Sequence, residues 1–281
     1  MKRSTSYPKP ESLEATAHSH RLEQYSRYAP TLIADTGAVV EDHATVKATG
    51  TMTAGDLDAD DTKTFTIDSP QGTYGSLAVD SATGAWTYTL DNTDGDTDAL
   101  AAGALVTDTI TVTVTDDEGA TATQDVVVTI TGANDGPVIT SAVTAAQGTV
   151  SENATTATAT GTITASDVDT GHTLTYSIDN SQGTYGSLAV DSATGVWTYT
   201  LDNNDADTDA LAAEASVTDT ITVTVTDDQG ATATEDVAVT ITGANDGPVI
   251  TSAAADAEGA VTEDAQTATA TGTLTASDVD A

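Results

Sequence analysis

Apolar and polar residues alternate strictly in several segments of this chain. Residues 85–90 read Ala-Trp-Thr-Tyr-Thr-Leu, which places Trp86, Tyr88 and Leu90 on one face and threonines on the other. Residues 109–115 alternate Thr with Ile and Val in the same way. Because successive side chains of an extended strand point to opposite faces, this period of two predicts half-buried β-strands. Threonine on the outer face keeps the β-propensity high and the surface polar.

Turn-forming residues separate the alternating segments. Asp116-Asp-Glu-Gly119 follows the second segment, and the chain returns through apolar positions 126, 128 and 130, which predicts a β-hairpin. About seven short strands per repeat, with turns roughly every 8 to 12 residues and no convincing helix, predict an all-β fold of antiparallel, immunoglobulin-like β-sandwiches. Trp86 and Trp197 occupy inward alternating positions, so we interpret them as core residues. Sugar stacking by their rings is the second interpretation.

The chain also repeats itself at a long, fixed offset. The segment QGTYGSLAVDSATG at 71–84 recurs 111 positions later at 182–195, and Gly132-Ala-Asn-Asp-Gly-Pro137 recurs with the same offset. A unit of about 100 residues can bury its own core, so this period predicts tandem domains. We expect the sequence to continue after Ala281, because the third copy there lacks its closing strands. The predicted organisation is a non-repeat leader, two complete repeats and the start of a third: residues 1–29, 30–136, 137–247 and 248–281.

Charge narrows the possible partners. The formal net charge is −37, and residues 1–27 hold five basic and three acidic side chains, after which only Lys47 and Lys63 are basic. Such a surface repels nucleic acid and anionic lipid and attracts cations. The chain contains no cysteine, so no disulfide staples the domains. No apolar run is long enough to span a membrane, and no apolar segment of a secretory signal follows the basic N-terminus.

Several shorter motifs have open interpretations. Residues 12–25 form either a short helix or a mobile tail. Asp94-Gly-Asp-Thr-Asp98 has alternating acids but lacks the glycine and glutamate of an EF-hand, so it is a solvated loop or an accessory calcium ligand. Asn153-Ala-Thr155 is a weak glycosylation sequon. The histidines are scattered, which indicates surface residues rather than a zinc site: His18, His20, His43 and His172.

Acidic residues gather where the predicted sandwiches end. Glu41 is predicted at the entry of a strand, Asp91 follows the Trp86 strand, and Asn134-Asp135 and Asp167-Val-Asp169 flank the start of the next copy. Calcium takes about 6 to 8 oxygen ligands, so a site has to collect acids from separate segments. Alternate residues of an extended segment turn the same way, which suits the Asp-Val-Asp pair. The sequence therefore predicts calcium sites at the junctions between copies.

These residues resemble the cadherin calcium-binding pattern. The repeats over residues 30–281, with the signature VTVTDDEGATATQDVVVTITGANDGPVIT, resemble the VCBS repeat, a cadherin-like module of giant RTX-type bacterial surface adhesins. The resemblance implies one ligand set at each junction. The first set is Glu41, Asp91, Asn134, Asp135, Asp167 and Asp169. The second set is Glu152, Asp202, Asn245, Asp246, Asp278 and Asp280. Arg27-Tyr-Ala-Pro30 replaces Asn-Asp-Gly-Pro before the first repeat, so a weaker site is expected there with Asp56 and Asp58.

The resemblance also implies a function. It implies a calcium-stiffened extracellular extender of a bacterial surface or biofilm adhesin, exported unfolded by a type I system and folded where calcium is abundant. Its partners would be calcium, the neighbouring repeats, and polysaccharide or protein of a cell surface or matrix. The alternative is a calcium-dependent accessory module of a secreted enzyme. The chain itself is not predicted to be an enzyme, because it shows no nucleophile arrangement and no glycine-rich phosphate loop.

Overall fold

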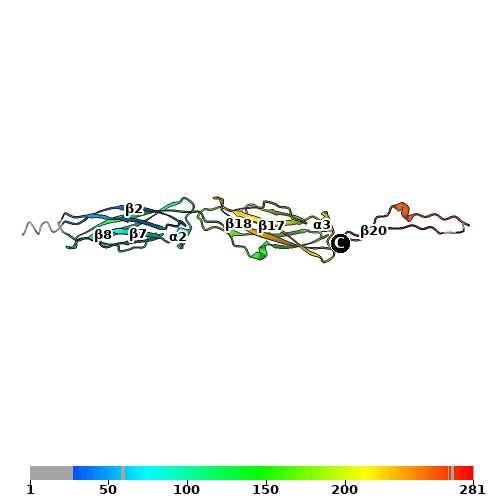
Figure 1. Cartoon of the computed structure of the whole chain (residues 1–281), viewed down its shortest axis with the longest axis horizontal. Coiled ribbons are helices and arrows are strands. Elements are labelled where there is room, and N and C mark those ends of the chain that lie inside the picture. The colour runs from blue at the N-terminus through cyan, green and yellow to red at the C-terminus, as the bar shows by residue number, and fades with distance from the viewer. Residues whose placement is uncertain (1–27, 58–60, 265, 267–268, 281) are drawn as a thin grey trace, which may run out of the picture. The chain divides into compact units, whose positions relative to one another are not determined.

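The computed structural model describes residues 28–57, 61–264, 266 and 269–280, and the possible helix over 12–25 lies outside them. The chain divides into two compact units, which Figure 1 shows by the colour of the ribbon. The first comprises Met1–Asp135 and Val168–Gly171, and the second comprises Gly136–Asp167 and His172–Ala281. The loop Val168–Gly171 therefore packs with the first unit, although the sequence on both sides of it belongs to the second.

The first unit is a sandwich of two sheets. The strand order is β2-β9-β8-β5 in the four-stranded sheet and β3-β7-β6 in the three-stranded sheet, while β1 and β4 form a separate pair. The elements are β1 (Thr31–Ile33), β2 (Asp35–Val40), β3 (Lys47–Thr51), β4 (Thr53–Gly55), β5 (Thr64–Thr66), β6 (Gly75–Val79), β7 (Ala85–Leu90), α2 (Gly95–Asp98), β8 (Leu105–Thr115) and β9 (Thr121–Thr131).

The second unit repeats this plan with the same two sheets. Their strand orders are β11-β18-β17-β14 and β12-β16-β15. Its elements are β10 (Val138–Ile139), η1 (Val143–Ala146), β11 (Gln147–Ser151), β12 (Thr158–Thr162), β13 (Ala165–Ser166), β14 (Thr175–Ser177), β15 (Gly186–Val190), β16 (Val196–Leu201), α3 (Ala206–Asp209), β17 (Ser216–Thr226) and β18 (Thr232–Thr242). The third copy begins with β19 (Val249–Ile250), η2 (Ala254–Ala257) and β20 (Ala276–Ser277).

The pairing of the strands confirms the predicted tandem β-sandwich and adds one feature. The predicted hairpin is present as β8 and β9, which pair antiparallel from Leu105↔Thr131 to Thr115↔Thr121. The first strand of each four-stranded sheet, however, runs parallel to the last strand of its repeat: β2 beside β9, and β11 beside β18. Local alternation could not indicate this, because both orientations bury the same face of a strand.

The helical segments of both units are short turns. In α2 the carboxylate of Asp94 accepts a hydrogen bond from the Asp96 N–H at 3.0 Å, and in α3 Asp205 accepts from the Asp207 N–H at 2.9 Å. Four residues are too few for a helical period to show, which is why the sequence pattern did not predict them. No helix in the described part of the chain has the length and apolar character to cross a membrane.

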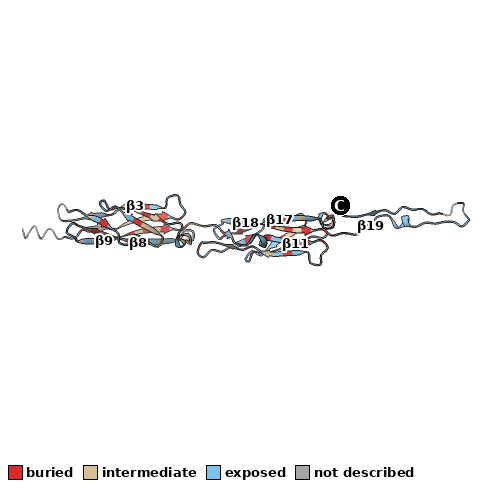
Figure 2. Ribbon diagram, turned by 90° about the horizontal axis from the view of Figure 1, so that it is seen from below, coloured by how far each residue is buried: buried red, intermediate tan, exposed pale blue. Residues whose placement is uncertain are grey.

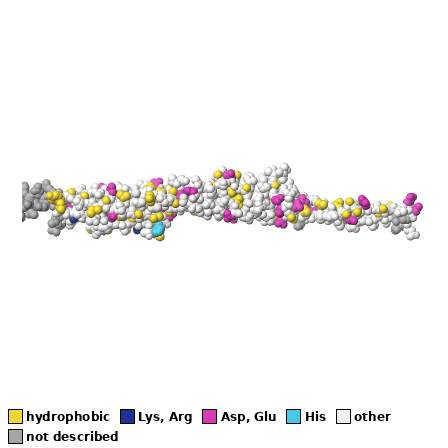
Figure 3. Space-filling view, turned by 90° about the horizontal axis from the view of Figure 1, so that it is seen from above, with side chains coloured by type: hydrophobic (Ala, Val, Ile, Leu, Met, Phe, Trp, Pro, Cys, Tyr) yellow, Lys and Arg dark blue, Asp and Glu magenta, His cyan; other side chains and the backbone are white. Residues whose placement is uncertain are grey.

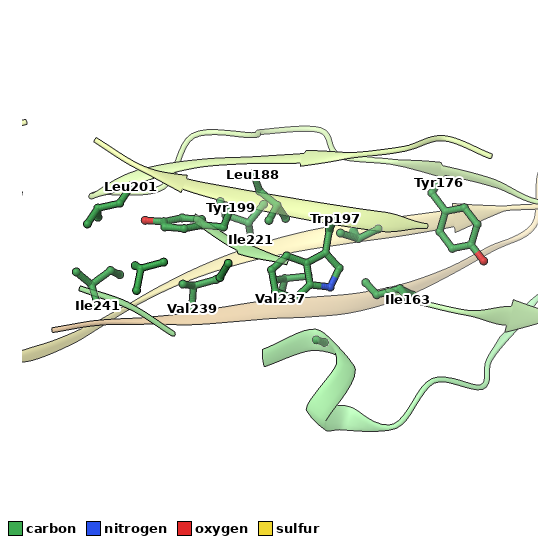
Figure 4. Close-up of a cluster of buried hydrophobic side chains, with 14 of the residues drawn as sticks. Ile163, Tyr176, Leu188, Trp197, Tyr199, Leu201, Ile221, Val237, Val239 and Ile241 are labelled. Carbon is green, nitrogen blue, oxygen red and sulfur yellow. The ribbon is translucent and has the colours of Figure 1, made fainter. Parts of the chain in front are cut away.

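The core of each unit lies between its two sheets. Figure 2 shows the buried residues on alternating positions of the strands in both units. Trp86 is 1% exposed and Trp197 is 0% exposed, so the core interpretation is confirmed and their ring faces are not available to a sugar. In the second unit Trp197 belongs to one cluster with Ile163, Tyr199 and Val237 (Figure 4).

One buried carboxylate in each unit has a structural role. Asp108 is 3% exposed and accepts hydrogen bonds from the Tyr88 hydroxyl at 2.6 Å and from the N–H groups of Thr73 and Tyr74 at 2.8 and 3.1 Å. Asp219 makes the corresponding three bonds in the second unit. Three donors compensate the loss of hydration, so this acid fixes the repeated Gln-Gly-Thr-Tyr turn against the core.

Candidate metal centres

A buried glutamate begins the acidic cluster of the first unit. Glu41 directly follows β2, and its N–H continues the ladder to the Thr131 carbonyl at 2.9 Å. Its side chain is 2% exposed, and Oε2 accepts a hydrogen bond from the Ala133 N–H at 3.0 Å. One ligand atom each of Glu41, Asp98 and Asp135 lies within 4.8 Å of the other two. This is a suitable spacing for one shared cation.

Two further segments complete this cluster. Asp98 is the last residue of α2, and its N–H donates to the Asp94 carbonyl at 3.0 Å, so the helical turn fixes its backbone. Asp169 accepts a hydrogen bond from the Asp135 N–H at 2.9 Å. The Val168–Gly171 loop is held in place because the N–H and hydroxyl of Thr170 both donate to the Ala99 carbonyl, at 3.1 and 2.8 Å.

The electrostatics of the first cluster favour a cation. The pKa of Glu41 is raised from 4.5 to about 7, first by burial and then by the negative charges of Asp135, Asp42 and Asp169, while the hydrogen bond from Ala133 acts to lower it. Carboxylates close to one another in a poorly hydrated place repel each other when ionised. A divalent cation would offset both the repulsion between the carboxylates and their loss of hydration. It supplies positive charge, and it coordinates the oxygens that water no longer reaches.

The second unit builds the same cluster from its own residues. Glu152 follows β11, is 3% exposed, and accepts from the Ala244 N–H through Oε2 at 2.9 Å. Glu152, Asp209 and Asp246 bring one ligand atom each within 4.8 Å, and Asp280 accepts from the Asp246 N–H at 3.0 Å. Burial, and then the charges of the three neighbouring aspartates, raise the pKa of Glu152 above its ordinary value.

This second cluster leaves buried oxygens that nothing in the described chain satisfies. Glu152 Oε1, Asp246 Oδ2 and Asp280 Oδ1 are inaccessible to solvent and have no hydrogen-bond partner. The sequence contains no Lys or Arg after Lys63, so no basic side chain of this repeat can neutralise them. In the face shown in Figure 3, acidic side chains occur along both units, whereas the visible Lys and Arg belong to the first. The donor set consists of oxygens alone and fits a hard divalent cation such as calcium.

The other predicted ligands take different positions. Asp91 is exposed, and its Oδ1 accepts from the N–H and hydroxyl of Thr93 at 3.0 and 2.7 Å, which lowers its pKa. Asp202 accepts from the Asn204 N–H at 2.9 Å in the corresponding turn. Asp278 accepts from the Asp280 N–H at 3.2 Å. Among the described residues, none of the clusters contains Asp91, Asp167, Asp202 or Asp278.

The two predicted asparagines contribute through the backbone. The side-chain amide of Asn134 donates to the Asp135 carbonyl at 2.6 Å, and that of Asn245 donates to the Asp246 carbonyl at 2.5 Å. Each bond fixes the asparagine side chain immediately beside a clustered aspartate. The amides therefore shape the linker in both repeats.

Asp98 and Asp209 are the cluster residues that the ligand prediction left out. Sequence reasoning left the Asp94–Asp98 motif open between a solvated loop and an accessory ligand. The structure separates the two roles within the motif, because Asp94 caps α2 and Asp98 joins Glu41. An aspartate that can cap a helix four residues before another aspartate was the available signal.

A further acidic group lies at the other end of the first unit. Asp56, Asp61 and Asp116 approach one another within 4.8 Å, and so do Asp61, Asp117 and Glu118. The predicted partner Asp58 lies outside the described residues. His172 stands at the position of Asp61 in the second repeat, and no corresponding group occurs in the part of that repeat that the structure describes.

Two tandem β-sandwiches, each with a buried glutamate and clustered aspartates at one end, define a cadherin-like repeat protein. The chain belongs to the bacterial cadherin-like domain family, which matches residues 27–132 and 134–243. Cadherin-like repeats are generally extracellular modules for adhesion or extension and are typically not enzymes, and cadherin domains generally bind calcium and contact neighbouring repeats.

One of the solved cadherin structures to which the chain is similar shares its fold with a TM-score above 0.5. Mouse cadherin-23 EC22-24 is 18% identical with a TM-score of 0.53, over 90% of this chain and 78% of that chain. Human CDH23 EC21-23 is 18% identical with a TM-score of 0.48, over 90% and 81%. The protocadherin fragment PcdhgB3 EC1-4 is 21% identical with a TM-score of 0.48, and this chain covers 59% of it. A search of curated proteins found no match.

Proposed function

We propose that this chain is a calcium-binding segment of a bacterial surface adhesin, in which cations stiffen a row of extracellular repeats. The observation that carries the proposal is Glu152, which is 3% exposed, has one oxygen without a hydrogen-bond partner, and lies within 4.8 Å of ligand atoms of Asp209 and Asp246. A buried, uncompensated carboxylate is costly unless a cation binds to it.

The proposed ligands are the acids that the structure brings together. In the first unit they are Glu41, Asp98, Asp135 and Asp169. In the second they are Glu152, Asp209, Asp246 and Asp280. Neither set contains His or Cys, which disfavours zinc, and the acids come from loops and strand ends, which suit the irregular shell of calcium better than the strict octahedron of magnesium.

Each residue would have a defined part in binding. The glutamate would neutralise the cation from a buried position and the linker aspartate from a half-buried one. Their backbones are fixed by β2 or β11 and by the hydrogen bond to the next aspartate. The aspartate of α2 or α3 would bind from the opposite sheet. When bound, the cation supplies the positive charge that the chain lacks after Lys63.

The position of the linker in the sequence gives binding its proposed effect. Asp135 ends the first unit and Gly136 begins the second, and the chain returns to the first unit at Val168–Gly171. A cation held by Asp135 and Asp169 would restrain every segment through which the two repeats are connected. We propose that this restraint stiffens the array, and that the repeats are of the VCBS type, exported by a type I system and displayed at the cell surface or in a biofilm, with polysaccharide or protein as candidate distal partners.

Calorimetric titration of the full chain tests the proposal. We expect calcium to bind at two or more sites and to raise the unfolding temperature. At ten times the dissociation constant of one site, the free energy of unfolding should rise by about 1.4 kcal/mol. Glu152→Gln should remove one binding event. The matched control is Glu235→Gln, which removes the same charge from the surface of β18 and introduces the residue found at the corresponding position of the first repeat, Gln124. Identical binding curves for both variants would contradict the proposal.

Small-angle scattering tests the stiffening separately. The maximum dimension and the flexibility of the full chain should differ between calcium and chelator, and Asp169→Ala should behave in calcium as the parent chain behaves in chelator. Calcium binding without any change in scattering would retain the metal sites and reject the stiffening.

A further inference from the structure

The residue that follows the buried glutamate differs between the repeats. It is Asp42 in the first and Asn153 in the second, and in the third Asp264 follows Glu263, which is exposed. All three adopt a left-handed backbone, with φ of 52°, 57° and 59°. Aspartate and asparagine are the non-glycine residues that tolerate this conformation best. The backbone is thus the same in each repeat, and the variable is the charge of the side chain.

The side chain at this position lies at the edge of the cation cluster. In the second unit, Asn153 Nδ2 donates to Asp246 Oδ1 at 3.3 Å, so an amide donor occupies one oxygen of a proposed ligand. In the first unit, the charge of Asp42 is among the three carboxylates that raise the pKa of Glu41. An aspartate there offers no donor and adds a full negative charge. Both Asp42 and Asn153 are exposed.

We propose that this residue sets the calcium affinity of each cluster, so that Asp42 makes the first cluster the tighter site and Asn153 makes the second the weaker one. The inference rests on the proposed function. The four clustered acids are one glutamate and three aspartates in both units, so their residue types do not account for a difference in calcium affinity. The adjacent His43, whose Nδ1 accepts from the Thr45 N–H at 3.3 Å, stands where the second repeat has Ala154.

The expected difference in affinity is electrostatic. One additional negative charge a few ångströms from a divalent cation at a solvated surface changes its affinity on the order of tenfold. Because Asp42 and Asn153 are exposed, added salt should screen this contribution. The amide of Asn153 also lowers the calcium affinity of the second cluster, because a cation competes with its hydrogen bond to Asp246.

Nuclear magnetic resonance can follow the two clusters separately in one sample of the full chain. The N–H groups of Ala133 and Ala244 donate to Glu41 and Glu152, so their chemical shifts report on one cluster each. During a calcium titration the Ala133 signal should reach its midpoint at about tenfold lower calcium than the Ala244 signal. Asp42→Asn should raise the Ala133 midpoint, Asn153→Asp should lower the Ala244 midpoint, and both changes should shrink as potassium chloride is added.

A second variant separates charge from the amide contact. Asn153→Gly removes the donor, adds no charge and suits the left-handed backbone, so the Ala244 midpoint should fall less than in Asn153→Asp. A readout without calcium completes the test: in chelator, Asp42→Asn should raise the unfolding temperature and Asn153→Asp should lower it, because each changes the repulsion among the acids.

The outcomes distinguish this inference from the function on which it rests. Unchanged midpoints in Asp42→Asn and Asn153→Asp, with calcium still shifting both amide signals, would overturn the inference and retain the calcium sites. Shifts that persist undiminished at high salt would show direct ligation by residue 42 and overturn the electrostatic account. Amide signals that do not respond to calcium at all would overturn the proposed function and this inference together.

Discussion

A carboxylate oxygen of Glu41 lies within 4.8 Å of a ligand atom of Asp98, although the two residues follow strands of different sheets. Glu41 follows β2 of the four-stranded sheet, and Asp98 ends the helical turn after β7 of the three-stranded sheet. The cluster therefore brings the segment after β2 and the helical turn after β7 together at one end of the sandwich. A cation placed there would act on the stability of the domain as well as on its linker.

The distinction between Asp98 and Asp91 is directly testable. Asp98→Asn should weaken calcium binding at the first cluster by about tenfold or more, because it removes a charged oxygen ligand. Asp91→Asn should leave the Ala133 midpoint within about twofold, since its carboxylate binds Thr93. Equal effects of the two variants in the amide titration would show that the turn at 91–94 takes part in the site.

The raised pKa of Glu41 predicts a dependence of stability on pH in the absence of calcium. Its pKa is about 7 in the folded chain and 4.5 ordinarily, so the folded state binds the proton more tightly. Stability from this group is fully present below pH 4.5 and is lost as the pH rises to about 7, on the order of 3 kcal/mol in total.

Denaturant unfolding in chelator, compared between the parent chain and Glu41→Gln, measures this loss. The glutamine variant cannot ionise, so the difference between the two chains should grow in its favour between pH 4.5 and 8. In calcium the difference should reverse, because the parent chain then binds the cation. A constant difference across this pH range would contradict the assigned pKa.

Magnesium should stabilise the chain much less than calcium at the same concentration. The clustered acids come from a strand end, a helical turn and two linker segments, which suit a large and irregular shell. Differential scanning calorimetry in the two chlorides, with potassium chloride matched for ionic strength, makes the comparison. Equal stabilisation by both ions would indicate general screening of the negative surface instead of specific sites.

The loop Val168–Gly171 should become mobile when calcium is removed. Two hydrogen bonds from Thr170 to the Ala99 carbonyl and one from the Asp135 N–H to Asp169 hold it in the first unit. Amide hydrogen exchange at Thr170 should accelerate in chelator and in Asp169→Ala, while amides in the middle of β9 remain protected. Unchanged exchange at Thr170 would show that the loop is held without the cation.

The buried acid of the second core should matter for stability in either state of the metal sites. Asp219→Asn keeps the shape but turns an amide donor either toward the N–H of Thr184 or toward the N–H of Tyr185 and the hydroxyl of Tyr199, at a cost of about 2 to 4 kcal/mol. Asp236→Asn is the control, because Asp236 is exposed and accepts from Thr222 alone among the described hydrogen bonds. Denaturant midpoints in chelator should separate the two variants.

The sequence predicted the β-sandwich because the alternation that indicates a half-buried strand is a local pattern. Alternation around Trp86 and Trp197 determines which face of a strand is buried, and the structure buries both rings. The parallel pairing of β2 with β9 joins the two ends of a repeat, and no local pattern encodes such a pairing. The turns α2 and α3 were missed because their four residues are stabilised by an aspartate cap and not by a long apolar stripe.

The candidate sites, like the fold, were predictable in part: the acids at strand ends and in the linker were predicted, and the acid of the turn after β7 was not. Glu41, Asp135 and Asp169 stand where regular strands and a repeated linker end, so their approach follows from the fold. Whether Asp91 or Asp98 turns toward Glu41 depends on the conformation of the eight residues after β7, and both acids fit the same spacing argument. Asp91 turns back to Thr93 because a nearby hydroxyl and N–H satisfy it locally.

The parallel pairing of β2 and β9 determines how each repeat would carry tension. Force applied through the chain would pull β2 toward its N-terminal end and β9 toward its C-terminal end, which are opposite directions along the same ladder. The hydrogen bonds between Asp35↔Val126 and Val40↔Thr131 would then be loaded in shear and would have to break together instead of opening one after another. β11 and β18 give the second unit the same geometry over five residue pairs. A repeat connected in this way resists extension along its own strands before its core is exposed.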